Sequence, residues 1–419
     1  MRKILFFIVI LFIIGCGSEE NNNTSQNIIT QRGTPLRGGY PFYLTDKNIT
    51  WIDGLDFLLK DEFNYSILDF NKTAFENLHN YIQQNKYFSM WFVKSWFDAG
   101  TPSNWYHLDS IQKAMDKGYI PVFLFYYFGD SYNYVMPNDD EISQYYKDTQ
   151  KFVDYISTLK GKKIVIVEPE FNKNIVLNNQ DNADKMAQVY SNAIDIIKTL
   201  SDVEISLCMM DTGNRGVYET FEKCGYKNCA LGDKEEWSRS EIIYNQLLNK
   251  IDFISFQEMV SQFMRDPSNP GSNDNPNLKV YTADEIGVDF LADRINNFSN
   301  FLTNKYHKPV MLAYVSIASG VWNDINGDLK IEDDEFSPNG WDLKIDNFYN
   351  NMRNLEANLS KNNLLAYIPM ALIDDPVHDI NGYQAFNRNE YHLGLVSTSA
   401  KDENDTALYG DLKCKIKCQ

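Results

Sequence analysis

Eight short and nearly uninterrupted apolar runs follow one another along the chain, and they constrain the fold more than any other feature. Strands that are buried on both faces of a parallel sheet are continuously hydrophobic, whereas strands with one solvent-facing side alternate between apolar and polar residues. The runs are YSILDF (65–70), SMWFVKSWF (89–97), YIPVFLFYYF (119–128), KIVIVEPE (163–170), EISLCMMD (204–211), DFISFQEM (252–259), PVMLAYVSI (309–317) and LLAYIPMAL (364–372). We therefore predict eight parallel strands.

Amphipathic stretches separate many of these runs. Residues 139–159 and 183–200 carry apolar side chains at helical spacing, and Thr282 with Glu285 forms a capping-box pair before another helix. Gly118 is placed to end a helix before the third strand. Alternating strands and helices of this number predict an α/β fold, a (β/α)₈ TIM barrel with decorated βα loops. An open doubly wound sheet is the alternative, which the absence of a glycine-rich phosphate loop after the first strand disfavours.

The N-terminus has the pattern of an export signal. Two basic residues precede the apolar run of residues 4–14, which is too short to span a bilayer but has the length of a signal-peptide core. The run ends in IIGC (13–16), which resembles the lipobox of bacterial lipoproteins with Ile13 in place of the usual Leu. This resemblance implies that Cys16 is acylated, with palmitate among its fatty acids, and anchors the protein in the bacterial cell envelope. An ordinary secretory signal is the alternative.

We predict four segments in the chain. They are a signal peptide (1–15), a polar, Asn-rich disordered tether (16–35), the barrel domain (36–400) and a C-terminal tail (401–419) with a disulfide. Removing the signal peptide changes the formal charge from −18 to −20, a charge that repels nucleic acid. We expect a monomer whose partners are a carbohydrate and, through the acylated cysteine, a lipid membrane.

The other cysteines fit an oxidising compartment. Cys224 lies close to Cys229, and Cys414 lies close to Cys418, so two local disulfides are expected. A zinc site built from these four thiols is the alternative. Cys208 lies within an apolar run and is expected to be a buried thiol.

Acidic residues gather where the predicted strands end. They are Glu168 and Glu170 at the fourth strand, Asp211 at the fifth, Glu258 at the sixth, and Asp374 and Asp375 at the eighth. In a TIM barrel the carboxyl ends of the strands form the rim of the active site. Carboxylates held close together repel one another, which raises their pKa values and lowers the stability of the fold. Such clusters are typical of functional sites, so this rim indicates metal binding or acid/base chemistry.

Glycoside hydrolysis uses two such carboxyl groups, one as an acid and one as a nucleophile or base. We predict Glu170 or Glu168 as the acid/base and Glu258 as its partner. Pro169 lacks an amide donor, so the fourth strand should end there and aim one of the two glutamates into the mouth. Glu170 is slightly favoured for that position.

The Glu168–Pro169 pair after the fourth strand resembles the Asn-Glu-Pro acid/base motif in a large clan of retaining (β/α)₈ glycosidases. Val167 replaces the Asn, and the seventh strand, AYVSIAS (313–319), has no Glu where that clan keeps its nucleophile. The resemblance therefore implies a glycosidase-like barrel, and it does not extend to the retaining mechanism.

Polar and aromatic residues near strand ends and in long loops are the predicted substrate contacts, because aromatic rings stack on sugars and polar groups hold hydroxyls. They are Tyr126, Asp130, Asn172, Asp211, Trp237, Gln257, Arg265, Trp322, Asp375 and His378.

The segment DINGDLKIEDDE (324–335) resembles the calcium-binding loop of EF-hand and dockerin modules. The resemblance implies a structural Ca²⁺ with the ligands Asp324, Asn326, Asp328, Lys330 (through its carbonyl), Glu332 and Glu335. Leu329 stands where the glycine of such loops usually lies. A solvated acidic loop without metal is the alternative.

These features predict a surface-tethered glycoside hydrolase acting on a poly- or oligosaccharide. A barrel that binds carbohydrate or another ligand without cleaving it is the main alternative, because fold does not fix function. A structural lipoprotein of the envelope is a third.

Overall fold

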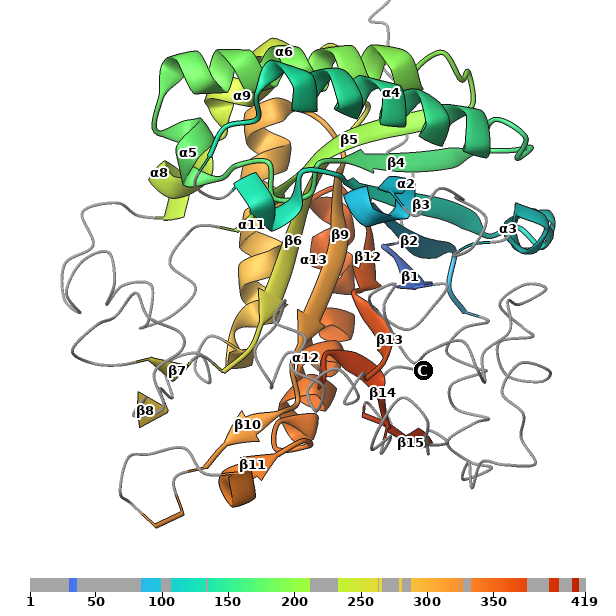
Figure 1. The fold of residues 1–419 in the computed structure, drawn as a ribbon. Helices are drawn as coiled ribbons and strands as arrows, with labels where there is room; N and C mark the ends of the chain where they lie inside the picture. Colours follow the sequence, from blue (N-terminus) through green and yellow to red (C-terminus); the bar gives the residue numbers. More distant parts are fainter. Residues whose placement is uncertain are drawn as a thin grey trace, which may run out of the picture.

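The structure is a computed structural model that describes thirteen parts of the 419-residue chain (Figure 1). These parts are residues 30–35, 84–98, 106, 108–132, 135–211, 233–262, 264–265, 279–280, 288–323, 325–326, 333–374, 392–398 and 409–413.

Eight parallel strands close into a barrel, and the predicted (β/α)₈ fold is confirmed. In chain order the strands are β1 (Gln31–Pro35), β2 (Tyr87–Val93), β3 (Ile120–Tyr126), β4 (Lys163–Val167), β5 (Val203–Met210), β6 (Ile254–Val260), β9 (Val310–Ile317) and β12 (Leu364–Pro369). Each strand pairs with the strand before it and the strand after it in this order. The ring is closed by β1, which pairs with both β12 and β2.

The first barrel strand differs from the prediction. Residues 31–35, expected to belong to the tether, form β1, in which Gln31 pairs with Ala366 and Gly33 with Tyr87. The run YSILDF (65–70) lies outside the described residues. A polar strand can occupy this position because the pairing that closes the barrel is made by backbone groups, which do not depend on apolar side chains.

Helices cover the outside of the barrel. They are α2 (Lys94–Asp98), α3 (Leu108–Asp116), α4 (Asp139–Ile156), α5 (Asn174–Leu177), α6 (Gln180–Ile197), α8 (Asp233–Ser238), α9 (Glu241–Leu247), α11 (Leu291–Tyr306), α12 (Asp342–Asn354) and α13 (Glu356–Lys361). Figure 1 shows α4, α6 and α9 above β4 and β5, and α11 beside β6. Asn138 and Glu141 form a capping box at the start of α4, and Gly118 adopts a positive φ of 96° after α3, as a C-terminal cap requires.

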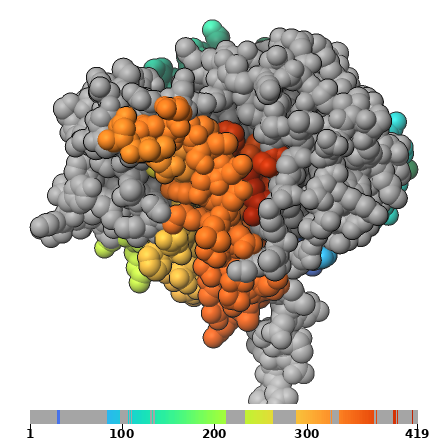
Figure 2. All heavy atoms as spheres, turned by 90° about the horizontal axis from the view of Figure 1, so that it is seen from below, coloured from blue at the N-terminus to red at the C-terminus, as the bar shows by residue number. Residues whose placement is uncertain are grey.

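Short elements lie beyond the ends of the barrel strands. They are η2 (Gly129–Tyr132), η3 (Asp333–Glu335), the pair β7 (Met264–Arg265) and β8 (Lys279–Val280), the pair β10 (Val321–Trp322) and β11 (Phe336–Ser337), and a sheet of β13 (Ala371–Ile373), β14 (Gly394–Thr398) and β15 (Tyr409–Leu412). At the end toward which β6 and β9 run, the described surface is formed mainly by the orange segments around β10, β11 and α12 (Figure 2).

The C-terminal segment is part of the fold. β15 pairs with β14, and Lys413, which follows it, is buried against Asp374 with its Nζ 2.6 Å from Oδ1. The prediction that residues 401–419 form a separate tail is therefore wrong for 409–413. Cys208 is a buried free thiol, as expected, while the other five cysteines lie outside the described residues.

Two apolar clusters lie on the two faces of the sheet. Alternate strand residues such as Leu124 and Ile166 fill the barrel interior, whereas their neighbours Phe125 and Val167 pack against the helices. This alternation follows from the twofold side-chain period of a strand. It therefore decides which polar residues at the strand ends face the mouth of the barrel and which face the helices.

A bulge in β9 breaks this alternation next to the site. Phe256 of β6 pairs with Leu312, but the next residue, Gln257, pairs with Tyr314, so β9 holds one additional residue. Consequently Ala313 and Tyr314 both belong to the interior cluster. The bulge turns a tyrosine into the barrel that strict alternation would place against the helices.

No helix among the described residues is long and apolar enough to cross a membrane.

Candidate functional site

The chain turns sharply at the end of β4. Glu168 and Glu170 both have positive φ, at 45° and 64°, a conformation that non-glycine residues rarely adopt. The Glu168 amide still bonds to the carbonyl of Phe125 and the Glu170 amide to that of Cys208. These bonds to both neighbouring strands hold the turn in place. Because the extended strand ends at Val167, the two carboxyl groups do not follow strand alternation.

Glu170 reaches the barrel mouth and is held there by three donors. Its Oε2 accepts a hydrogen bond from the Tyr126 hydroxyl at 3.1 Å, and its Oε1 accepts from the Tyr314 hydroxyl at 2.9 Å and from Gln257 Nε2 at 3.4 Å. The Lys173 ammonium lies 3.9 Å from Oε2. Donors on both oxygens and a nearby cation favour an ionised carboxylate. The side chain is 18% exposed, so this carboxylate is accessible from solvent.

The three donor side chains come from three different strands, and all three point into the barrel. Tyr126 ends β3, Gln257 is the inward-facing neighbour of Glu258 in β6, and Tyr314 is turned inward by the bulge in β9. Trp91 of β2 packs edge-on against both tyrosine rings, with centroid distances of 5.9 Å to Tyr126 and 4.9 Å to Tyr314. The aromatic contacts fix the positions of the two hydroxyl groups.

The carboxyl group of Glu168 is in a different environment. The residue is 3% exposed, and its Oε2 accepts a 3.3 Å hydrogen bond from the Phe128 amide. Burial raises the pKa of Glu168 from 4.5 to about 8, although the Phe128 and Tyr127 amides, the Tyr145 hydroxyl and Lys173 offset part of this effect. With this pKa the carboxyl group of Glu168 is mostly protonated at pH 7.

Glu168 and Glu170 line one small pocket at the end of β4. Its walls include Tyr126, Phe128, Tyr132, Lys173, Met186 and Tyr190, so they come from the end of β3 and the segment after it, from the residue that precedes α5, and from α6. The neutral acid and the carboxylate thus share one cavity.

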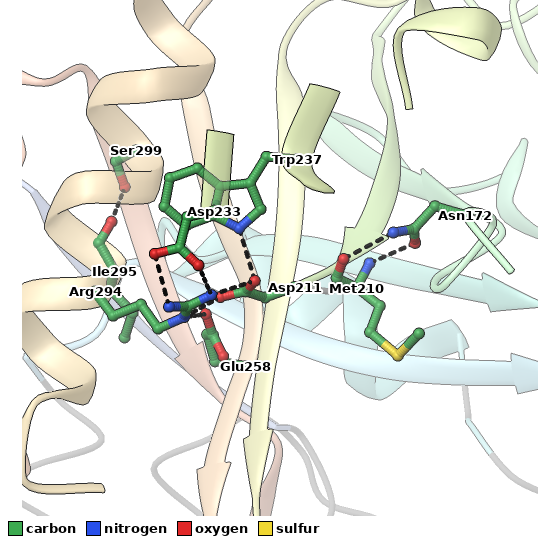
Figure 3. Close-up of polar contacts among 9 residues, drawn as sticks. All are labelled: Asn172, Met210, Asp211, Asp233, Trp237, Glu258, Arg294, Ile295 and Ser299. Atoms are coloured by element: carbon green, nitrogen blue, oxygen red, sulfur yellow. Dashed lines mark hydrogen bonds and ion pairs between the residues drawn. The ribbon is translucent and has the colours of Figure 1, made fainter. Parts of the chain in front are cut away.

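Asp211 and Glu258 lie on the helix-facing side of the sheet, around Arg294 of α11 (Figure 3). Arg294 donates to both oxygens of Asp211, at 2.5 and 2.8 Å, and its Nε lies 4.0 Å from Glu258 Oε1. Both acidic side chains are fully buried. Coulombic attraction to Asp211 and Glu258 raises the pKa of Arg294 despite the opposing effect of burial.

Two further residues complete this arginine cluster. Asp233 of α8 lies 3.2 Å from the guanidinium, and the indole of Trp237 donates to Asp211 at 2.7 Å. Trp237 is 3% exposed and stacks on Phe298, so it presents no face to a ligand. Asp211 and Trp237, predicted as substrate contacts, therefore serve in the packing of α8 and α11 on the barrel.

Glu258, the predicted partner of Glu170, is not brought to it. The side chain of Gln257, next to it in β6, contacts Glu170 instead. Successive residues of a strand point to opposite faces, so the sequence-based assignment of both Gln257 and Glu258 to the barrel mouth could hold for only one of them.

The remaining predicted substrate residues divide into two groups. Asn172 exchanges two hydrogen bonds with the backbone of Met210, away from the arginine cluster in Figure 3, and Trp322 is 6% exposed with its amide bound to Gln262. The side chains of Asp130 and Arg265, and all of Asp375 and His378, lie outside what the structure describes.

Most of the predicted calcium loop also lies outside the described residues, including Asp324, Asp328, Lys330 and Glu332. Asn326 is exposed, and Glu335 is buried with its Oε1 accepting a 2.9 Å hydrogen bond from the Ile325 amide. Within the described part of the chain no group of three or more His, Cys, Asp or Glu side chains is placed to hold a metal ion. Cys16 belongs to the undescribed residues as well.

Sequence reasoning missed Tyr314 and Lys173 as parts of the site. Lys173 follows Glu170 by three positions, a spacing that could have been read as an ion pair. The run containing Tyr314 gave no such signal, because a bulge is set by pairing with the neighbouring strand.

Comparison with known proteins supports the fold. No protein-family model matches the sequence, and no curated protein is similar to it. Among solved structures, a hyperthermophilic beta-glucosidase from Pyrococcus furiosus superposes with a TM-score of 0.50 at 11% identity, over 94% of each chain. A family 1 beta-glucosidase from Thermotoga maritima (TM-score 0.44, 14% identity, 82% of this chain and 84% of that one) and a GH5_18 variant from Bifidobacterium longum (TM-score 0.44, 12% identity, 84% and 72%) are also similar.

The fold and the site together define a (β/α)₈ barrel with an accessible carboxylate at the carboxyl end of its fourth strand. The Pyrococcus furiosus beta-glucosidase has the same barrel architecture, and at 11% identity the similarity extends to the fold alone.

Proposed function

We propose that the protein is a glycoside hydrolase that acts on a poly- or oligosaccharide at the mouth of the barrel, with Glu170 as the reacting carboxylate. The observation that carries the proposal is the position of Glu170, which contacts Tyr126, Gln257 and Tyr314 from three inward-facing strands and is reached by solvent. Catalytic residues of TIM barrels come from the carboxyl ends of several strands in this way.

The surroundings of Glu170 suit a nucleophile or general base. Fixed hydrogen bonds to both oxygens hold the carboxylate in one orientation, and positioning of this kind lowers the barrier to reaction. The negative charge of Glu170 can also stabilise an oxocarbenium-like transition state.

Carbohydrate binding without cleavage is the second candidate function. It is favoured by the position of Glu258, which is committed to Arg294 on the other side of the sheet and so does not provide Glu170 with a second carboxyl group.

The test is to incubate the purified protein with a panel of poly- and oligosaccharides and to measure the release of reducing ends. We expect turnover of at least one glycan, which Glu170→Gln lowers by about 10²–10⁴-fold. Glu258→Gln is the matched control. It makes the same substitution at a buried glutamate of β6 that faces Arg294, so the variant should retain activity. Binding without turnover would favour the second function, and full activity of Glu170→Gln would refute the assignment.

We propose in addition that the protein is a lipoprotein of the bacterial cell envelope, anchored through Cys16, and that residues 324–335 bind a structural calcium ion. The lipobox-like IIGC and the spacing of the acidic residues in the loop support these two proposals. Metabolic labelling with a palmitate analogue, compared between the wild type and Cys16→Ser, tests the first. The second is tested by a calcium titration described below.

A further inference from the structure

Lysine residues surround the end of the barrel opposite the mouth. Parallel strands all begin at that end, so the segments that lead into them meet there. The described segments of this kind are residues 84–86, 117–119, 157–162, 198–202, 248–253, 307–309 and 362–363, and we call the surface that they form the basic face. With histidine counted as neutral, it carries two aspartates, Asp202 and Asp252, and seven lysines, which are Lys86, Lys117, Lys160, Lys162, Lys198, Lys250 and Lys308.

The basic face is positive although the chain as a whole has a formal charge of −18. The adjoining residues leave its balance unchanged, because the last three residues of the helices that directly precede these segments and the first two of each barrel strand add four basic and four acidic side chains. These are Arg32, Lys163, Lys305 and Lys361 against Asp116, Asp154, Asp195 and Glu204. Seven lysines less two aspartates therefore leave an excess of five positive charges at one end of the molecule.

Helix ends explain only part of this excess. A cation beside the last turn of a helix is favourable because of the helix dipole, which accounts for Lys117 and Lys198. Lys160 and Lys162 lie three and five positions beyond Ser157, the residue that caps α4, and both lysines are exposed. Lys162 pairs with a glutamate of β5 at 2.8 Å, but ion pairs between exposed side chains are weak, so a larger anionic surface can compete for its charge.

The chain enters the barrel at the basic face. The Thr30 amide donates a 2.8 Å hydrogen bond to Oγ of Ser360, and its hydroxyl donates one of 2.9 Å to the carbonyl of Leu364. Ser360 lies in the last turn of α13, and Leu364 is the first residue of β12. Cys16 precedes Thr30 by 14 positions, which span at most about 50 Å. A lipid on Cys16 would thus be attached on the side of the basic face, and this orientation needs the least extension of the chain.

We propose that the basic face docks on the anionic phospholipid headgroups of the membrane that holds Cys16, so that the mouth of the barrel points away from that membrane. The inference rests on the proposed lipid anchor. Lysines are attracted to an anionic lipid surface over about 8–10 Å at physiological salt. Anchoring makes the contact intramolecular, so a weak attraction is sufficient. The carboxylate of Glu170 lies at the opposite end, and the same surface repels it. The substrate is then a glycan outside the membrane and not the sugar of a lipid within it.

The test is lysine labelling of the acylated protein in vesicles of phosphatidylcholine and in vesicles of an equimolar mixture with phosphatidylglycerol. N-hydroxysuccinimidyl acetate modifies exposed lysines, and mass spectrometry of the peptides gives the rate at each position. We expect Lys160, Lys162 and Lys198 to react about fivefold more slowly on the anionic vesicles. Lys185 in α6 and Lys234 in α8, which are exposed and lie outside the basic face, should react equally on both. The protection should disappear in about 1 M salt, where the screening length is about 3 Å.

A pair of double variants locates the effect. Lys160→Glu combined with Lys361→Glu reverses two charges at the basic end of the barrel and should abolish the protection of Lys198. Lys147→Glu combined with Lys234→Glu makes the same change of charge at two exposed helical lysines outside the basic face, so it should keep the protection. Thermal denaturation confirms that both variants are folded before they are reconstituted.

The outcomes separate this inference from the proposed function. Equal labelling of the basic face on both kinds of vesicle, or protection of Lys185 and Lys234 in its place, would overturn the docking while the lipid anchor stands. A Cys16 that carries no lipid would refute the anchor and the docking together. Protection of the basic face without turnover of any glycan would support the docking and refute hydrolysis.

Discussion

The hydroxyl of Tyr314 donates a 2.9 Å hydrogen bond to Oε1 of Glu170, across 144 positions of sequence. The bulge in β9 makes this contact, because it turns Tyr314 inward next to Gln257. The seventh barrel strand thus contributes a phenol to the carboxylate at the end of the fourth strand.

Tyr314→Phe should lower kcat/KM by about 10–100-fold, because a hydrogen bond to a charged group contributes about 1.5–3 kcal/mol. This is measured as kcat/KM for the glycan of the panel that the wild type hydrolyses fastest. Tyr244→Phe is the control, since the Tyr244 hydroxyl is buried against the carbonyl of Leu207 and does not contact the site. Wild-type activity of Tyr314→Phe would contradict a role for this contact.

Arg294→Met should reduce the free energy of unfolding by about 3–5 kcal/mol, because it leaves Asp211 and Glu258 buried without their cation. Urea denaturation measures the loss. Glu258→Gln keeps the arginine and removes one charge, so its effect on stability should be smaller and its activity should be retained. A folded but inactive Glu258→Gln variant would show that Glu258 is a catalyst after all.

Glu168 should make the stability of the protein depend on pH. Its pKa is about 8 in the folded state and 4.5 in the unfolded chain, so the folded state binds the proton more tightly. The contribution of Glu168 to the free energy of unfolding is therefore greatest below pH 4.5 and decreases as the pH rises to about 8. Glu168→Gln has no such proton, so its melting temperature should rise relative to the wild type across this interval.

The control for this measurement is Glu204→Gln, because the Glu204 side chain is 42% exposed and pairs with Lys162 at the surface. A constant difference in melting temperature between Glu168→Gln and the wild type from pH 5 to 8.5 would rule out the raised pKa.

Calcium should raise the melting temperature of the wild type, and EGTA should lower it, if residues 324–335 bind the ion. Asp324→Ala should abolish the response. Glu335→Ala should lower stability even without calcium, because it removes the oxygen that accepts a hydrogen bond from the Ile325 amide. An identical calcium response in the wild type and Asp324→Ala would refute the site.

Lys413→Met should destabilise the protein by about 3–5 kcal/mol, because it removes the ammonium group that pairs with the buried carboxylate of Asp374. Chemical denaturation measures this loss, and removal of residues 401–419 should cause at least as much. Pairing Lys413→Met with Asp374→Asn should recover part of the stability. If Lys413→Met alone is neutral, the C-terminal segment does not stabilise the end of the eighth strand.

The sequence by itself determined the barrel and the place of its principal acidic residues. Seven of the eight predicted runs coincide with barrel strands, because strands buried on both faces must be continuously apolar. Glu168 and Glu170 could be placed at the end of the fourth strand because Pro169 interrupts the ladder there. The first strand, Gln31–Pro35, carried no such signal, since it is polar and is held by backbone pairing.

Only the tertiary structure decided which acidic residue faces the mouth and which faces the helices. Glu258 pairs with Arg294 because of its side of β6, and Tyr314 reaches Glu170 because of one additional residue in β9. Strand register and bulges arise from pairing between segments that are far apart in the chain, so their effect on side-chain direction cannot be obtained from any one segment.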